Sequence, residues 1–121
     1  MAGGRWYEDG RYGGRTLAEW LPEVVADIVR EHDPLKVILF GSLARGESGP
    51  DSDIDLLVVL PDAPFAERIR MMGAVRRSIR APVPVDVFVT DPDEIARRGH
   101  LTGSILYPAL HEGVVVHERA A

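Results

Sequence analysis

The sequence contains no cysteine, which excludes a disulfide framework and any metal site built on thiolates. No apolar run approaches the length that crosses a membrane, and the glycine- and arginine-rich start lacks the hydrophobic stretch of a signal peptide. Basic residues are outnumbered, with 14 Lys and Arg against 19 Asp and Glu, and the net charge of -5 disfavours indiscriminate binding to nucleic-acid backbones. These absences favour a cytoplasmic protein that contacts neither a membrane nor nucleic acid directly.

The remaining composition is that of an ordinary globular protein. The chain has 121 residues, of which 45% are hydrophobic and 27% charged, enough for one modest core. Residues 1–15 carry five glycines and three arginines among aromatic residues and show no periodicity. They predict a flexible N-terminal arm, with contact to a partner or to nucleic acid as the alternative. Residues 16–121 are predicted to form a single domain.

The first long helix is marked at both ends. Thr16 followed by Glu19 has the pattern of a capping box, which begins a helix. Apolar residues then recur at helical spacing, so one stripe of this helix is expected to face the core. The helix is predicted to end near His32, because Pro34 disfavours helical geometry in the residue before it.

A second helix is predicted over residues 65–80, after a proline-containing turn. Its core-facing residues are expected to be Phe65, Ile69, Met72, Val75 and Ile79. Its other face carries Arg68, Arg70, Arg76, Arg77 and Arg80, which indicate either a solvated surface or contact with an acidic or phosphate-bearing partner. A short helix is expected to begin at Pro92, capped by Asp91. Pro108 argues against the second half of a helix over residues 101–110.

Runs of branched apolar residues predict strands over residues 35–40, 53–60, 85–89 and 114–116. We expect an α+β fold with α/β-type layers, in which a mixed sheet of three or four strands carries helices mainly on one face.

Three aspartates are the strongest chemical signal in the sequence. Asp53 and Asp55 lie two residues apart at the start of a predicted strand, so their carboxylates project from the same face of the sheet. Asp86 follows on a later strand and joins that face if the two strands are neighbours. Clustered carboxylates repel one another unless one is protonated or a divalent cation binds them. Mg²⁺ suits an open site of carboxylate oxygens, and a pair of such ions can assist phosphoryl transfer.

A glycine-containing turn accompanies these acids. Gly41 and Ser42 come directly after the first predicted strand, where backbone N–H groups and a hydroxyl can approach a phosphate. A Gly-Ser pair after a strand is by itself a weak signal. It becomes strong when it is combined with the Asp53 and Asp55 pair and with a third acid on a later strand.

Gly41-Ser42, ten intervening residues and then Asp53-Ile54-Asp55 resemble the signature of the minimal nucleotidyltransferases, relatives of DNA polymerase beta and kanamycin nucleotidyltransferase. The resemblance spans roughly residues 16–118 and implies a nucleotidyltransferase fold, whose core has the order α-β-α-β-α-β. It also implies that Asp53 and Asp55 hold two Mg²⁺ ions, and that Asp86 completes the metal site and helps activate the acceptor hydroxyl. Gly41 and Ser42 would bind the triphosphate of the incoming nucleotide.

Two further residues match the same family pattern around this turn. Ser52 is assigned with the nucleotide-binding residues. Arg45 stands where the family usually has arginine, and a phosphate contact and a structural ion pair are equally open for it.

Many minimal nucleotidyltransferases are antitoxins paired with a HEPN-domain ribonuclease toxin. The resemblance therefore implies transfer of AMP from ATP to a tyrosine hydroxyl of such a toxin, with release of pyrophosphate. We expect no second substrate-recognition domain, so the acceptor is expected to be a partner protein. The alternatives are an antitoxin that masks its toxin by binding alone and an enzyme that modifies a small molecule. The sequence identifies neither the base nor the oligomeric state, and a homo-oligomer is compatible with it.

Two competing motifs fail on single residues. Gly41 to Ser48 imitates a phosphate-binding P-loop, but Glu47 stands where that loop needs lysine. The aspartates from residue 51 onward imitate a calcium loop, but Leu56 replaces its required glycine. The remaining alternative is that the aspartates only cap strand ends, exposed to solvent, and have no catalytic role.

Overall fold

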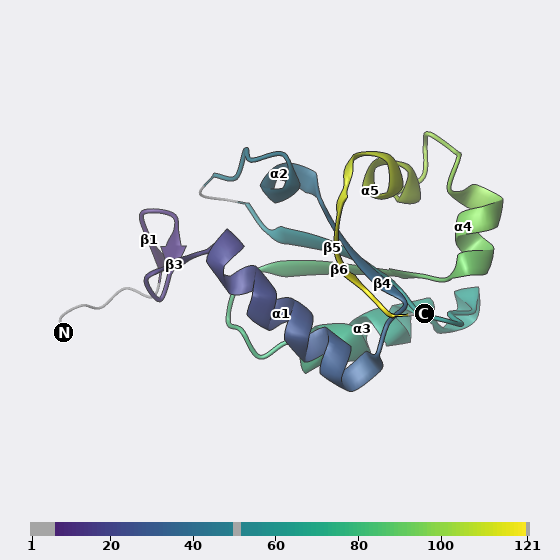
Figure 1. Ribbon diagram of the computed structural model, residues 1–121, viewed down its shortest axis with the longest axis horizontal. Helices are drawn as coiled ribbons and strands as arrows, with labels where there is room; N and C mark the ends of the chain where they lie inside the picture. The colour runs from purple at the N-terminus through teal and green to yellow at the C-terminus, as the bar shows by residue number, and fades with distance from the viewer. Residues whose placement is uncertain (1–6, 50–51, 121) are drawn as a thin grey trace.

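A mixed four-stranded sheet lies at the centre of the chain, in the order β6-β5-β4-β7 (Figure 1). The computed structural model describes residues 7–49 and 52–120, and its strands are β4 (Lys36–Phe40), β5 (Ile54–Val59), β6 (Val85–Thr90) and β7 (Val114–Glu118). β4 pairs antiparallel with β5 and with β7, whereas β5 pairs parallel with β6. The predicted α+β class with a mixed sheet is confirmed.

The two longest helices, α1 (Leu17–His32) and α3 (Arg68–Ser78), lie on one face of the sheet (Figure 1). The short helices α2 (Gly41–Ala44) and α5 (Leu106–Glu112) lie on the other face, and α4 (Pro92–Arg98) follows β6. The segment from α1 to β6 has the predicted α-β-α-β-α-β order. No helix in the described part of the chain is long and apolar enough to span a membrane.

The sheet is buried on both faces because side chains alternate along each strand. In β4, Val37 and Leu39 pack into the larger core with α1, whereas Ile38 and Phe40 pack with Leu106 of α5 in a smaller one. In β5 and β6 the charged residues, Asp55 and Asp86, lie near the strand starts. The candidate site lies at those starts, on the face that carries the smaller core.

The capping box at the start of α1 forms as predicted. The backbone N–H of Glu19 donates to Thr16 Oγ1 at 3.2 Å, and the Glu19 carboxylate accepts from the Thr16 N–H at 2.8 Å. Asp33 ends the helix in the left-handed conformation, with φ of 43°, immediately before Pro34. Both predicted ends of this helix are confirmed.

Residues 7–15, which were predicted to be a flexible arm, form a small meander with Thr16. Its strands β1 (Tyr7–Glu8), β2 (Arg11–Tyr12) and β3 (Arg15–Thr16) pair antiparallel. Trp20 of α1 fixes the meander, because its indole N–H donates to the Tyr12 carbonyl at 2.8 Å and the Arg15 guanidinium lies 3.9 Å from its ring centroid. Two-residue strands have no sequence periodicity, so the pattern gave no sign of them. Residues 1–6 lie outside the described part of the chain.

The predicted core face of the second helix is wrong at its start. The segment opens as a 3-10 turn, η1 (Phe65–Glu67), and both Phe65 and Ile69 are 78% exposed. The core contact is centred instead on Val75, which is fully buried, with Met71 and Met72 packed partly against the core. Met72, Val75 and Ile79 of the predicted stripe thus contact the core, whereas Phe65 and Ile69 do not.

Two proline-related predictions have different outcomes. Pro92 begins α4 as predicted, with the Asp91 carboxylate accepting from the Glu94 N–H at 2.8 Å. The prediction for residues 101–110 is wrong, because α5 begins only at Leu106 and continues through Pro108 to Glu112. Pro108 is the third residue of the helix, where a backbone N–H has no partner within the helix, so proline costs little there.

Candidate active site

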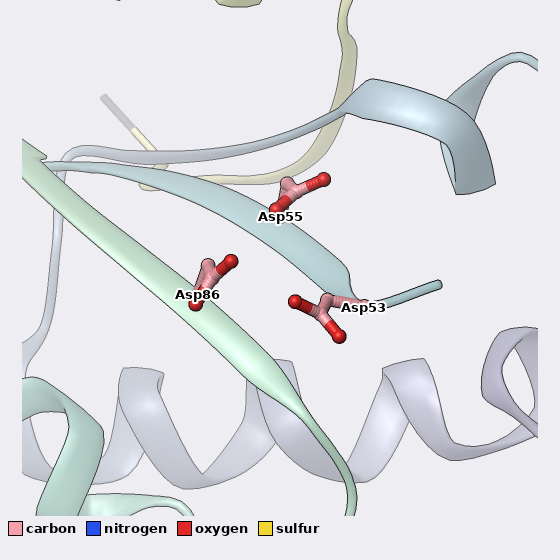
Figure 2. A group of neighbouring side chains, drawn as sticks. All are labelled: Asp53, Asp55 and Asp86. Atoms are coloured by element: carbon pink, nitrogen blue, oxygen red, sulfur yellow. The ribbon is translucent and has the colours of Figure 1, made fainter. Parts of the chain in front are cut away.

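Three carboxylates converge at one edge of the smaller core. Asp53 directly precedes β5, Asp55 is the second residue of β5, and Asp86 is the second residue of β6. Parallel pairing places Asp55 and Asp86 side by side in register. Each of the three offers an oxygen, and these oxygens lie within 4.8 Å of one another (Figure 2). The structure thus brings together the three acids that the sequence singled out.

The electrostatics of this cluster oppose full ionisation. Burial raises the pKa of Asp55, and the charges of Asp86 and Asp53 raise it further against the opposing charge of Arg45. Burial also raises the pKa of Asp53, followed by its hydrogen bond to Asp86 and the charge of that residue, while Arg76 opposes the shift. A divalent cation would remove this repulsion. A donor set of carboxylate oxygens alone, half-open to solvent, fits a hard cation such as Mg²⁺.

The raised pKa of Asp55 determines how the stability of the protein depends on pH. Between its ordinary value of 3.8 and the raised pKa, the folded protein holds a proton that the unfolded chain releases, so the free energy of unfolding falls as the pH rises through that window. In chelator at neutral pH, Asp55→Asn is therefore expected to melt at a higher temperature than the wild type. Thermal scans should show Mg²⁺ raising the melting temperature of the wild type more than that of the variant. A variant that melts lower than the wild type in chelator would contradict the clustering.

Gly41 lies directly against the cluster. It follows β4, has φ of +79°, and a Cβ built on it would overlap the Asp55 carboxylate. The preceding residue, Phe40, is the strand partner of Asp55. Glycine is therefore required here twice, for its backbone conformation and for its lack of a side chain. The turn that the sequence proposed for phosphate binding is adjacent to the aspartates.

Ser42 and Ser52 are joined across the loop. Ser42 Oγ donates to Ser52 Oγ at 3.2 Å, and Ser52 Oγ also accepts the Gly49 N–H at 2.6 Å. The Ser52 hydroxyl thus ties the end of the loop to the Gly41–Ser42 turn. A direct contact between Ser52 and a nucleotide stays a prediction.

Arg45 forms the structural ion pair that was one of its two open roles. Its Nε donates to the Glu47 carboxylate at 2.9 Å, and this hydrogen bond raises the pKa of Arg45. The side chain is still 50% exposed. Its charge also acts on Asp55. A phosphate contact for Arg45 stays a prediction.

Arg76 belongs to the surroundings of the site, although the sequence analysis placed it only on the charged face of a helix. Its charge opposes the rise in the pKa of Asp53 that burial and Asp86 cause. Two features of the sequence could have indicated that Arg76 lies near the acids. Arg76 follows Met72 by four residues, so the two lie on the same side of the helix, and a short loop connects the end of α3 to β6. The sequence alone did not show that this end of α3 approaches the acids.

Comparison with known proteins supports the same chemistry. The model of the nucleotidyltransferase domain family matches residues 22–98. A solved structure from Sulfolobus solfataricus, of a protein provisionally described as a nucleotidyltransferase, is 29% identical with a TM-score of 0.58, and the similarity covers 82% of this chain and 78% of that one. No curated protein matches the chain.

Proposed function

Because the chain belongs to the nucleotidyltransferase domain family, we propose that it transfers AMP from ATP to a hydroxyl of a partner protein, in a reaction that depends on Mg²⁺. The observation that carries the proposal is the convergence of Asp53, Asp55 and Asp86 within 4.8 Å, beside the Gly41 turn. Such a site has a cluster of carboxylates that suits cations, next to backbone N–H groups that suit phosphate oxygens. These are the two parts that nucleotidyl transfer needs.

Each residue has a role in this proposal. Asp53 and Asp55, with Asp86, would hold two Mg²⁺ ions, which when bound neutralise charge on the phosphates and favour ionisation of the attacking hydroxyl. Gly41 and Ser42 orient the triphosphate, and Ser52 positions Ser42 through its hydroxyl.

The step itself forms one bond and breaks one bond. The acceptor oxygen bonds to the α-phosphorus of ATP, and the bond from that phosphorus to the bridging oxygen of pyrophosphate breaks. The hydroxyl proton passes to Asp86, the most exposed of the three acids, before it reaches solvent. AMP is then esterified to the partner, and pyrophosphate leaves.

The acceptor that we propose is a HEPN-domain ribonuclease toxin, with this chain as its antitoxin. Support for this assignment comes from the resemblance to minimal nucleotidyltransferases, whose motif is present from Gly41 to Asp86. Asp86 is exposed, so a hydroxyl on another protein can reach it. Modification of a toxin hydroxyl would silence the ribonuclease.

The test uses ATP labelled at the α-phosphate, Mg²⁺ and the HEPN-domain protein that the proposal expects to be encoded by the neighbouring gene. Label is expected on the partner with wild-type protein, and it is expected to disappear with Asp53→Ala. Asp62→Ala is the matched control, because Asp62 is an exposed aspartate outside the cluster. Label that persists in Asp53→Ala would overturn the catalytic assignment. A tight complex without label would instead identify an antitoxin that masks its toxin, and label on a small molecule alone would identify a different acceptor.

A further inference from the structure

An open apolar groove of about 400 Å³ lies at the β6 edge of the sheet, where side chains of the face that carries the aspartates meet the start of α3. Its lining includes Leu57, Phe65, Ile69, Met72, Phe88 and Leu106. Phe65 and Ile69 are each 78% exposed, and Ile105 at its border is 48% exposed. Large apolar side chains gathered at an exposed groove mark an interaction site rather than a random surface.

The groove continues directly from the aspartate cluster. Leu57 follows Asp55 by two residues and Phe88 follows Asp86 by two, so alternation puts all four side chains on one face. Leu57 and Phe88 are also strand partners. Two residues along a strand span roughly 7 Å, so the first residues of the groove are the nearest neighbours of the acids on the same face of their strands.

The order of the strands indicates from which side the attacking hydroxyl reaches the nucleotide. Gly41 follows β4, the acids lie on β5 and β6, and α3 packs along β6 with Ile69 and Met72 at the groove. An in-line displacement places the attacking oxygen and the leaving pyrophosphate on opposite sides of the phosphorus. If the triphosphate lies at the Gly41 turn, the attacking hydroxyl arrives from the β6 side.

We propose that this groove docks the acceptor protein, through a segment with apolar anchors flanked by acidic residues. The inference rests on the proposed function, because the direction of attack depends on where the triphosphate binds. Phe65 and Ile69 protrude too far to enclose a small molecule, whereas they can insert between side chains of a folded partner.

The charges beside the groove indicate the sign of the partner's flanks. Arg76 lies in line with Ile69 and Met72 by helical spacing and acts on Asp53, so it stands between the groove and the acids. Arg76 and Arg77 are exposed, and neither has an ion-pair partner within residues 7–49 and 52–120. A second copy docked across a two-fold axis would bring like charges toward them, so an acidic partner fits better.

The experiment measures transfer to the HEPN-domain protein described above with Ile69→Gln, a polar variant that keeps helix propensity. The KM for the partner is expected to rise about tenfold or more, while kcat and the KM for ATP stay as in the wild type. Because Ile69 is 78% exposed, the melting temperature should not change. Val115→Thr is the control, because Val115 is 48% exposed on β7 at the opposite edge of the sheet and should leave the KM unchanged.

The possible outcomes distinguish failure of the docking proposal from failure of the proposed function. Label on the partner with an unchanged KM in Ile69→Gln would overturn the groove and leave the proposed function intact. Binding without label, weakened at least tenfold by Ile69→Gln, would support the groove while the proposed function fails. A wild type that neither labels nor binds this protein, or one that dimerises until Ile69 is replaced, would overturn the docking assignment.

Discussion

Asp86→Asn is expected to lower kcat for nucleotidyl transfer by about three orders of magnitude or more without unfolding the protein. Asparagine keeps the shape of the side chain but removes the charge that faces Asp53 and Asp55 within 4.8 Å. Loss of one carboxylate weakens charge stabilisation in the transition state and removes the group proposed to take the hydroxyl proton. Each 1.36 kcal/mol of lost stabilisation is about tenfold in rate, so several kcal/mol account for the expected loss.

Folding and catalysis can be separated at this residue. Asp86 is exposed and is a source of the charge that raises the pKa of both neighbouring aspartates, so its replacement should preserve or raise the melting temperature in chelator. Asp93→Asn is the matched control, because Asp93 is an exposed aspartate whose carboxylate contacts Arg97 away from the cluster. Initial rates of pyrophosphate release over a Mg²⁺ titration provide the measurement. A wild-type rate in Asp86→Asn at saturating Mg²⁺ would refute the role of this carboxylate.

The candidate site could be predicted from local sequence to the extent that strand alternation fixes it. Asp53 and Asp55 had to share a face, because they lie two apart at the start of a strand. Asp86 was different, since its place depended on the parallel register of β5 with β6, in which Asp55 and Asp86 are partners. No local pattern determines which strands are neighbours, so the third acid stayed conditional until the structure gave the pairing.

The second helix shows why an amphipathic pattern can be extended too far along a helix. Ile69 and Val75 belong to the same predicted stripe, and the sequence does not say how much of that stripe meets the sheet. The structure buries Val75 and leaves Ile69 78% exposed. At the exposed end of the stripe, Arg68 in the first turn of α3 pairs with Glu94 of α4.

Arg68→Met is expected to reduce the free energy of unfolding by about 3–5 kcal/mol, because it leaves a buried carboxylate without its main cation. Arg68 Nη1 lies 2.9 Å from Glu94 Oε2, and the two side chains are only 12% and 10% exposed. Arg68 Nε also donates to the Ala63 carbonyl at 2.8 Å. Among the residues that the structure describes, the variant keeps the Thr90 hydroxyl and Arg98, 3.8 Å away, as partners of the Glu94 carboxylate. Urea denaturation should report the loss as a lower midpoint.

The double variant Arg68→Met with Glu94→Leu distinguishes an unpaired charge from lost packing. Two apolar residues in place of a buried pair should recover most of the stability, because neither then carries an uncompensated charge. Arg97→Met supplies the exposed counterpart on α4, where Arg97 pairs with Asp93 at 3.0 Å and the side chains are 57% and 78% exposed. A surface pair contributes at most about 1 kcal/mol, so this control should barely shift the midpoint. If Arg68→Met and Arg97→Met lose equal stability, burial of the Arg68–Glu94 pair does not account for its contribution.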